Sequence, residues 1–328
     1  MYVFYILYYL NNYKELIIHT NNMTKTIEEV KHGLRRPILI PLVPWHDYEN
    51  LDVDTYGHNL RIYDDRMRRN TSDEPVTVCP AGTSKMPYLS DKHQILLMEA
   101  TREALGDRAT ILVGLFPSQN TLPLLHDLEE VVDGGMLMPV GVLKDPKGVF
   151  EGFSYIAERS KKPLVLYLRD DKLLQTYMDL LAGHENIVGV KVATKPSDIL
   201  DFKRSFPDRV FSWGKGEESV TAAYENGADS HTTGLGLVVP GVSYWVRKFG
   251  LSEDFKSCKA IEDVAKPFED VRGIRGMAYN VPVIQWLLQQ EELEHGLRPA
   301  KCIPFSSELP RDLQDTLKPK LESLKPYI

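Results

Sequence analysis

The sequence predicts an α/β protein, a (β/α)8 TIM barrel with additional C-terminal helices. From residue 36 onward, a short apolar, β-branched run followed by a longer amphipathic segment recurs eight times, which is typical of alternating strands and helices. The runs are apolar enough to be buried between two layers, as parallel strands are. A doubly wound open sheet is the alternative. It would more readily show a glycine-rich dinucleotide fingerprint after an early strand, whereas the nearest glycine cluster, 234–241, follows the eighth run.

The strands are expected in runs bounded by turn-forming residues. They span 36–43, 75–82, 109–116, 134–141, 162–169, 187–193, 209–215 and 228–234. Helices are expected at 90–105, 121–132, 148–160, 172–183, 195–206 and 216–227. Ser90 and Asp91 are candidate caps of the first of these helices. Asp170 and Asp171 precede the helix at 172–183, and we interpret them as its N-terminal cap rather than as paired catalytic carboxylates.

The pattern divides the chain into three parts. Residues 1–32 form an N-terminal extension, 33–236 the barrel, and 237–328 a helical layer packed on the barrel, with helices at 240–250, 253–269, 273–295 and 307–324. The extension begins with ten apolar or aromatic residues. These are too few for a membrane span of about 20 residues, and they lack the features of a secretory signal. The extension is either a docking segment or, as we favour, a disordered or non-native start upstream of Met23.

Composition narrows the class of ligand. The formal net charge of −7 argues against nucleic acid or a membrane surface as the main partner, and a small molecule is expected instead. Cys79, Cys258 and Cys302 have no Cys-x-x-Cys spacing, which predicts reduced thiols and a cytoplasmic protein. The histidines show no metal-ligand spacing, so neither a metal nor a cofactor is predicted.

One charged side chain falls within the apolar run 187–193, Ile-Val-Gly-Val-Lys-Val-Ala. Because strand side chains alternate, Val188, Val190 and Val192 are expected to face the helices. Lys191 then points into the barrel among small residues.

The preceding strand brings two more polar side chains to the same place. Tyr167 and Arg169 alternate inward, so an amine, a phenol and a guanidinium converge near the C-terminal mouth, where barrel active sites lie. Burial and the guanidinium disfavour the charged form of Lys191, and a neutral amine can form a Schiff base with a carbonyl while Tyr167 shuttles protons. The alternative is a structural lysine that snorkels or pairs with a carboxylate. Cys79 alternates to a position below the pocket and is predicted to be a core thiol.

Five motifs in collinear order resemble one known superfamily. In chain order they are PAGTSKMPYLS, LVLYLRDD, IVGVKVA, GADSHTTGLGLVVP and GLRPAKCIPFS. Together they resemble the dihydrodipicolinate synthase / N-acetylneuraminate lyase superfamily. Its members are pyruvate-dependent or 2-keto-acid class I aldolases and dehydratases on a (β/α)8 barrel, and they usually form homotetramers. The resemblance implies a divergent member that takes a keto acid as substrate, needs no cofactor and forms a homo-oligomer, either a dimer or a tetramer.

The resemblance also implies roles for particular residues. Lys191 matches the Schiff-base lysine and Tyr167 the proton-transferring tyrosine. Gly82, Thr83 and Ser84 match the start of the loop whose hydroxyl and backbone N–H groups hold the carboxylate of the keto acid.

Four further residues are candidate substrate contacts, each with a packing role as the alternative. Arg169 would bind a second carboxylate. Gly214 would let a ligand approach the end of the seventh strand. His231 and Thr232 would line the mouth from the eighth strand.

Two departures distinguish the chain from dihydrodipicolinate synthases. Lys85 and Met86 stand where the loop motif has glycine and glutamate, and Val140 and Gly141 stand where the synthases have a tyrosine pair that serves an inter-subunit proton relay. The Tyr-Leu-Arg-Asp segment of the fifth strand looks closer to 5-keto-4-deoxyglucarate dehydratase-like members.

We therefore predict a Schiff-base-forming lyase, an aldolase or a dehydratase, acting on pyruvate, a related 2-keto acid or a keto-sugar acid. One alternative is a catalytically inactive barrel that binds a keto or sugar acid as a sensor or scaffold. A metal-dependent aldolase barrel is the other.

Overall fold

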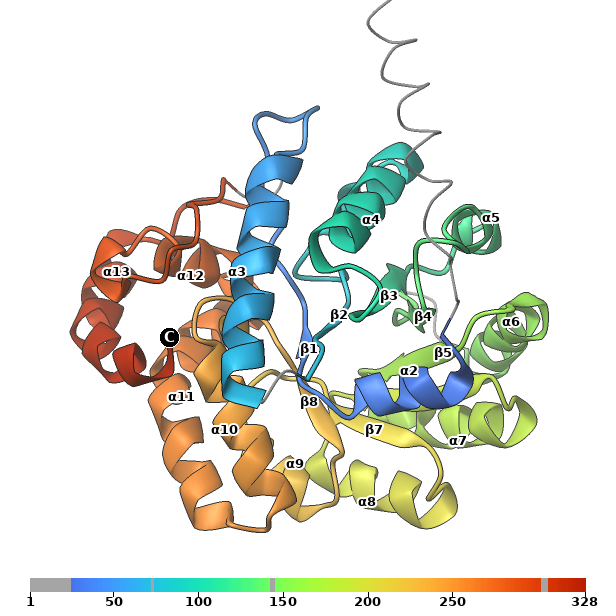
Figure 1. Ribbon diagram of the computed structural model, residues 1–328. Coiled ribbons are helices and arrows are strands. Elements are labelled where there is room, and N and C mark those ends of the chain that lie inside the picture. The colour runs from blue at the N-terminus through green and yellow to red at the C-terminus, as the bar shows by residue number, and fades with distance from the viewer. Residues whose placement is uncertain (1–24, 72–73, 142–144, 302–305) are drawn as a thin grey trace, which may run out of the picture.

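The computed structural model describes residues 25–71, 74–141, 145–301 and 306–328, and within them eight parallel strands form a closed barrel in chain order (Figure 1). The strands are β1 Ile38–Leu39, β2 Thr77–Val78, β3 Thr110–Leu115, β4 Gly134–Leu137, β5 Leu164–Leu168, β6 Ile187–Val192, β7 Val210–Trp213 and β8 Ser230–Thr233. The predicted barrel is confirmed, and each strand lies inside its predicted run. β1 and β2 are much shorter than predicted, because Pro41 and Pro80 just beyond them have no N–H group for the ladder.

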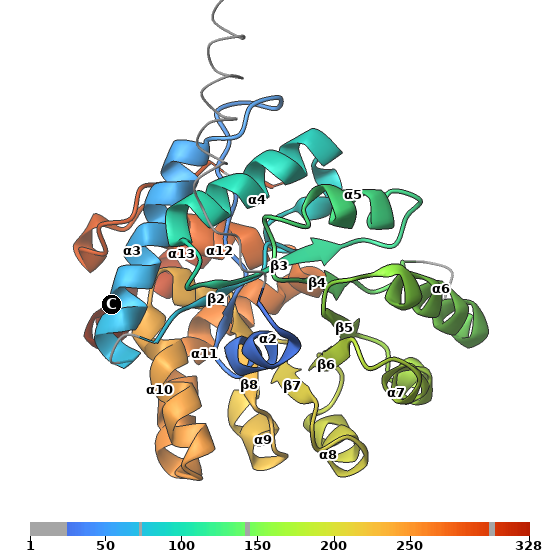
Figure 2. The ribbon, with the colours of Figure 1, turned by 45° about the vertical axis from the view of Figure 1, so that its right-hand side comes forward.

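Helices between the strands form an outer ring (Figure 2). They are α3 Val53–Thr71, α4 Asp91–Leu105, α5 Thr121–Asp127, α6 Pro146–Arg159, α7 Leu174–Gly183, α8 Pro196–Ser205 and α9 Val220–Glu225. Ser90 caps α4, since its hydroxyl accepts a hydrogen bond from the N–H of His93. Asp170 accepts one from the N–H of Lys172 at the start of the segment that leads into α7, as predicted.

The sequence pattern implies a helix after the first strand but gives no bounds for it, and the structure has α3 there, at Val53–Thr71. The buried stripe of this helix consists of Tyr56, Leu60, Tyr63 and Met67, which repeat every three or four residues and pack on the core. Charged and polar side chains fill most of its other positions, and they hide the helical period in the sequence.

Helix α2, Ile27–Leu34, closes the N-terminal end of the barrel and lies across it in Figure 2. Two backbone carbonyls at its end accept hydrogen bonds from strand hydroxyls. Gly33 accepts one from Thr77 at 2.6 Å, and Leu34 accepts one from Ser230 at 2.6 Å. The opposite, C-terminal end of the barrel is the end that α2 does not cover.

Part of the predicted extension thus belongs to the barrel. Residues 27–32 lie in α2, so the prediction of disorder is wrong for them. Residues 1–24, including Met23, lie outside the described residues, and the division of the chain at 33 and 237 stays a prediction.

Further helices follow β8 and cover one side of the barrel (Figure 1). They are α10 Pro240–Leu251, α11 Phe255–Met277, α12 Asn280–Leu287 and α13 Arg311–Leu317, followed by the 3-10 segment Lys318–Tyr327. α10 packs against α9 and α3 and so completes the ring. The break predicted between residues 269 and 273 is found a few residues later: Ile274, Arg275 and Gly276, near the end of α11, leave the helical conformation, and Arg275 and Gly276 take positive φ values. In the described ranges no helix is both long and apolar enough to cross a membrane.

Buried apolar side chains form one cluster inside the barrel and a larger one between the strands and the helices. On β5 the three leucines face the helices, while Val165 and Tyr167 belong to the inner cluster, as alternation predicts. Cys79 is also in the inner cluster, and burial raises the pKa of its thiol to about 12. The prediction of a core thiol at this position is confirmed.

Candidate active site

Lys191 and Tyr167 lie side by side near the C-terminal end of the barrel. They are partners in the register of β6 and β5, and Lys191 Nζ is 4.0 Å from the centre of the Tyr167 ring. Both side chains are buried, at 5% and 8% exposure. Among the described residues Lys191 forms no ion pair, so the alternative of a lysine neutralised by a carboxylate is not what the structure has.

A bulge in β6 orients Lys191 inward. Leu164 of β5 pairs with Ile187, but Val165 pairs with Gly189, so Val188 is an extra residue in β6. Val188 accordingly belongs to the cluster inside the barrel, and the prediction that it faces the helices is wrong. Gly189 is required at this place, because a Cβ there would overlap the carbonyl oxygen of Val210 on β7.

Gly214 leaves space for the stem of Lys191. It follows β7, and a Cβ at this position would lie 3.1 Å from Lys191 Cγ and 2.8 Å from Ala193 Cβ. The structure therefore places Gly214 against the predicted reactive lysine, where a side chain would displace it.

The predicted carboxylate-binding turn follows β2. Gly82 is exposed, Thr83 is half-buried, and Ser84 is buried. The Ser84 hydroxyl donates to the carbonyl of Pro41 at 2.5 Å, so its proton is used within the scaffold, contrary to a role as donor to a substrate. Thr83 lies nearer to solvent than Ser84, so its hydroxyl is the more accessible of the two in this turn.

Lys85 explains how the turn accommodates a departure from the family motif. Its φ of 56° is in the left-handed region, which a glycine adopts without strain. The Lys85 N–H donates to Gly82 and the Met86 N–H to Ala81, and both bonds close the turn. The amide N–H groups of Thr83 and Ser84 take no part in these two bonds.

Arg169 directly follows β5 and is exposed. Its Cζ is 6.0 Å from the centre of the Tyr167 ring, the same ring that Lys191 contacts. The guanidinium, the phenol and the amine therefore gather around one aromatic side chain, as the sequence predicts.

Both predicted contacts from β8 are buried. His231 is completely buried, with Nδ1 2.9 Å from the hydroxyl of Tyr224 on α9. It faces the helices, because Ser230 before it faces α2, and its predicted role in lining the pocket is wrong. Burial lowers the pKa of His231 to about 4, so the ring is neutral at neutral pH. Thr232 is also buried, and its hydroxyl donates to the carbonyl of Trp213 at 3.3 Å.

Sequence reasoning missed a residue that contacts the predicted site from outside the barrel. Asn280, the first residue of α12, donates from Nδ2 to Thr83 Oγ1 at 3.1 Å. Its Oδ1 accepts from Arg272 of α11, at 3.0 Å from Nε and 2.5 Å from Nη2. Asn280 and Thr83 are 197 residues apart in the chain, and no motif or spacing signals their contact.

A buried acidic pair holds this arginine. Arg272 forms an ion pair with Glu269, and the buried carboxyl of Glu217 is close enough to act on the charge of Glu269. Burial raises the pKa of Glu269 to about 8, and the Glu217 charge adds to the effect while Arg272 opposes it. A proton on Glu269 removes its repulsion with the neighbouring carboxyl.

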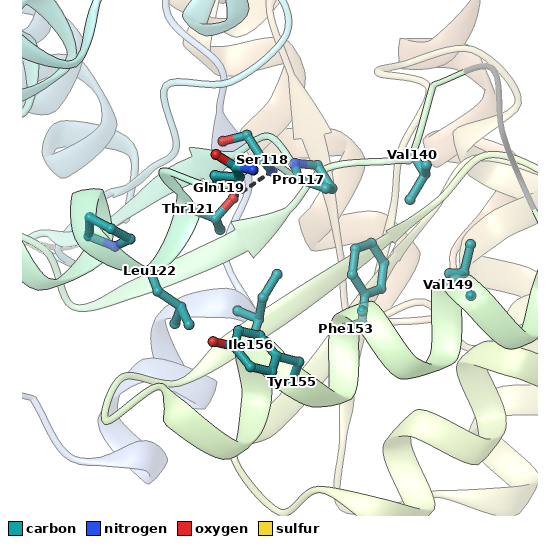
Figure 3. A pocket seen from close by; sticks show the side chains of 13 residues that line it. Pro117, Ser118, Gln119, Thr121, Leu122, Val140, Val149, Phe153, Tyr155 and Ile156 are labelled. Atoms are coloured by element: carbon teal, nitrogen blue, oxygen red, sulfur yellow. Dashed lines mark hydrogen bonds between the residues drawn. The ribbon is translucent and has the colours of Figure 1, made fainter.

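One groove of the described surface lies away from Lys191. A cavity of about 620 Å³ lies between α5 and α6 beside the ends of β3 and β4 (Figure 3). Leu122, Val140, Phe153 and Ile156 line it, so it is mainly apolar. We place the predicted reactive centre at Lys191 instead, because the described residues that line the groove include no lysine and no acid. Among all the residues that the structure describes, no three His, Cys, Asp or Glu side chains lie close enough together to hold a metal ion.

A buried amine beside a phenol, at the carboxyl end of a closed parallel barrel, is the pair of groups that a Schiff-base site requires. The family comparison agrees with this chemistry. Residues 35–320 match the model of the dihydrodipicolinate synthetase family, and the chain belongs to that family.

Individual relatives are distant. The 4-hydroxy-tetrahydrodipicolinate synthase of Heliobacterium modesticaldum is 27% identical over 164 residues, which cover 46% of this chain and 53% of that protein. The matches thus span about half the length of these curated relatives. A dihydrodipicolinate synthase structure from Bacillus clausii has a TM-score of 0.80 at 22% identity and covers 90% of this chain and 99% of that one. The chloride-inhibited dihydrodipicolinate synthase of Acinetobacter baumannii, solved with pyruvate, has a TM-score of 0.73 at 17% identity, with 90% and 100% covered.

Proposed function

We propose that the protein is a Schiff-base-forming lyase, an aldolase or a dehydratase, that acts on pyruvate, a related 2-keto acid or a keto-sugar acid. The observation that carries the proposal is the contact between Lys191 and Tyr167. The amine, which has no carboxylate partner among the described residues, is held 4.0 Å from the centre of a phenol ring, inside a barrel that is closed at its other end. Membership of the dihydrodipicolinate synthetase family supports the same chemistry.

The turn at Gly82–Thr83 receives the carboxylate of the keto acid in this proposal. The Thr83 hydroxyl and the N–H groups of the turn are donors, and successive donors of this kind form an anion-binding nest. Binding the carboxylate here orients the adjacent C2 carbonyl toward Lys191.

The Lys191 nitrogen then attacks C2, and a C–N bond forms while the carbonyl oxygen gains a proton. That oxygen leaves as water, and the product is an iminium ion. Tyr167 supplies the proton to the departing oxygen and accepts one from the nitrogen, as a general acid and base. The iminium is an electron sink, which stabilises the enamine that forms when C3 loses a proton or when the C3–C4 bond breaks.

The second half of the reaction is aldol cleavage, condensation or dehydration. In cleavage, the 4-hydroxyl of the keto acid loses its proton and an aldehyde leaves. In dehydration, the leaving hydroxyl takes up a proton and departs as water. Val140 and Gly141, where synthases have their tyrosine pair, favour a reaction other than lysine-precursor synthesis.

Borohydride trapping with pyruvate and with larger 2-keto acids, read by intact and peptide mass spectrometry, tests the proposal. The expected result is a reduced adduct on the Lys191 peptide that is absent from Lys191→Ala. Lys195→Ala is the matched control, since Lys195 is an exposed lysine just beyond β6 that pairs with Asp171. Absence of an adduct with every keto acid, in a folded protein, would reject the Schiff-base enzyme and favour a barrel that binds such acids as a sensor or scaffold.

A further inference from the structure

The contact between Asn280 and Thr83 brings the helical layer into the candidate site. The orientation of the Asn280 amide is determined by its partner, because an arginine side chain has only donors. Two of those donors, Nε and Nη2 of Arg272, face the same atom of Asn280, which must be the amide oxygen. The amide NH2 group therefore faces Thr83 and acts as the donor to its hydroxyl.

Arg272 is itself held in place from three directions. Its Nη1 pairs with Glu269, and its Nε and Nη2 bind Asn280. Gly234 packs against the guanidinium so closely that a Cβ at position 234 would lie 2.8 Å from Nη2. Arg272 is buried, and arginine keeps its charge at any ordinary pH. The amide of Asn280 consequently has one favourable orientation, and a flipped amide would place its NH2 group against the guanidinium.

This arrangement sets the direction of the Thr83 hydroxyl. A hydroxyl has one proton to donate, and here its oxygen already accepts a hydrogen bond from Asn280. The Thr83 proton is therefore free to point at a ligand. A hydrogen bond to a charged acceptor is stronger than one between neutral groups, so an anion gains most from a hydroxyl oriented in this way.

We propose that Asn280 is a positioning residue that fixes the Thr83 hydroxyl as the donor to the substrate carboxylate and so selects 2-keto acids over their uncharged analogues. This inference rests on the proposed function for the identity of the ligand. It adds that selectivity depends on a residue of α12, outside the barrel, which Arg272 and Glu269 hold in one orientation.

Asn280→Asp is the decisive variant because it keeps the size of the side chain. A carboxylate still accepts from Arg272, but it cannot donate to Thr83 and takes the Thr83 proton for itself. We expect the Kd for pyruvate to rise about tenfold or more, since a hydrogen bond to a charged group is stronger than one between neutral groups. The Kd for pyruvamide, which has no carboxylate, is expected to change much less. Gln289→Glu, an exposed position just after α12, controls for the added charge.

A double-mutant cycle separates positioning from a structural role. In a Thr83→Val background no hydroxyl remains to be oriented, so Asn280→Asp is expected to have little further effect on pyruvate affinity. Equal effects of Asn280→Asp with and without the Thr83 hydroxyl would overturn the proposal, as would equal losses for pyruvate and pyruvamide. Melting temperatures of all four proteins show whether the fold is kept.

Calorimetric titration and borohydride trapping on the same samples distinguish this inference from the proposed function. If pyruvate binds without forming an adduct and Asn280→Asp still weakens it selectively, the positioning role stands and the Schiff-base reaction does not. If the adduct forms and Asn280→Asp leaves affinity unchanged, the reaction stands and the positioning role is rejected. If wild type binds neither pyruvate nor larger 2-keto acids, both are rejected.

Discussion

Gly214 and Lys191 are packed against each other at the carboxyl ends of β7 and β6, so closely that a side chain at position 214 would begin 3.1 Å from Cγ of the lysine. The same side chain would lie 2.8 Å from Ala193 Cβ and 3.0 Å from the Val192 carbonyl oxygen. The position of the lysine stem thus depends on a residue that has no chemistry of its own.

Gly214→Ala is expected to slow the formation of the trapped adduct by about tenfold or more, because a displacement of the amine by about 1 Å is costly to a reaction that depends on orientation. Overpacking should also lower the free energy of unfolding by about 1–3 kcal/mol. Gly152→Ala is the control: it lies in α6, and a Cβ there meets nothing within 4 Å. That variant should be slightly more stable than wild type. Wild-type trapping rates in Gly214→Ala would show that Lys191 does not need the space.

Tyr167→Phe retains the ring that Lys191 contacts and removes only the hydroxyl. We expect imine formation to slow by about 10²–10⁴-fold, the usual contribution of a general acid and base. Its melting temperature should remain close to that of wild type, because the buried ring is kept. Adding borohydride at a series of times after the keto acid, and measuring the amount of reduced adduct, gives the rate of imine formation. A rate within twofold of wild type would assign proton transfer to another group.

Arg169→Ala tests whether the guanidinium beside Tyr167 binds a second carboxylate. Arg169 is exposed at the mouth, so its loss should leave the fold and the affinity for pyruvate nearly unchanged. The affinity for a 2-keto acid with a second carboxylate should fall about tenfold, as for a lost charge-assisted hydrogen bond. Titration calorimetry with pyruvate and with 2-oxoglutarate gives the comparison. Equal changes for both acids would contradict a role in substrate choice.

The acidic pair at Glu269 predicts a dependence of stability on pH. Burial raises the pKa of folded Glu269 to about 8, above its unfolded value near 4.5, so the folded state binds the additional proton between these values. This contribution is complete below pH 4.5 and is lost as pH rises through 8. His231 acts in the opposite direction, but only between about pH 4 and 6.5, so the interval from pH 6.5 to 8.5 reports on Glu269.

In that interval the free energy of unfolding of wild type should fall more steeply than that of Glu269→Gln, with a difference of at most about 1.4 kcal/mol per pH unit. Urea unfolding at several pH values measures both slopes. Parallel slopes would mean that Glu269 does not hold the proton.

Period-2 alternation predicts β5 correctly because that strand is regular, and Tyr167 is therefore found on the inner face. The same rule fails for Val188 because the bulge in β6 inserts one residue, yet it succeeds again at Lys191 beyond the bulge. A one-residue irregularity of this kind depends on the fit between Gly189 and the backbone of Val210, which no local pattern contains.

His231 and Asn280 show two other limits of the sequence. His231 lies on the predicted strand. The strand has too few apolar residues for the sequence to predict which of its faces His231 occupies. Asn280 contacts Thr83 only because α11 ends and the chain reverses toward the barrel mouth, with Arg275 and Gly276 in left-handed conformations. A contact between residues so distant in the chain follows from the packing of whole elements rather than from a motif.

The helix α2 covers the bottom of the barrel and so determines from which side water can reach the amine of Lys191. The family match begins at residue 35, directly after this helix ends at Leu34. A protein trimmed to the matched residues would lack Val30 and Leu34, and the inner cluster around Cys79 would open to solvent from below. The thiol, now unreactive, would then become accessible to alkylating reagents, so a short helix far from the substrate entrance keeps the interior dry.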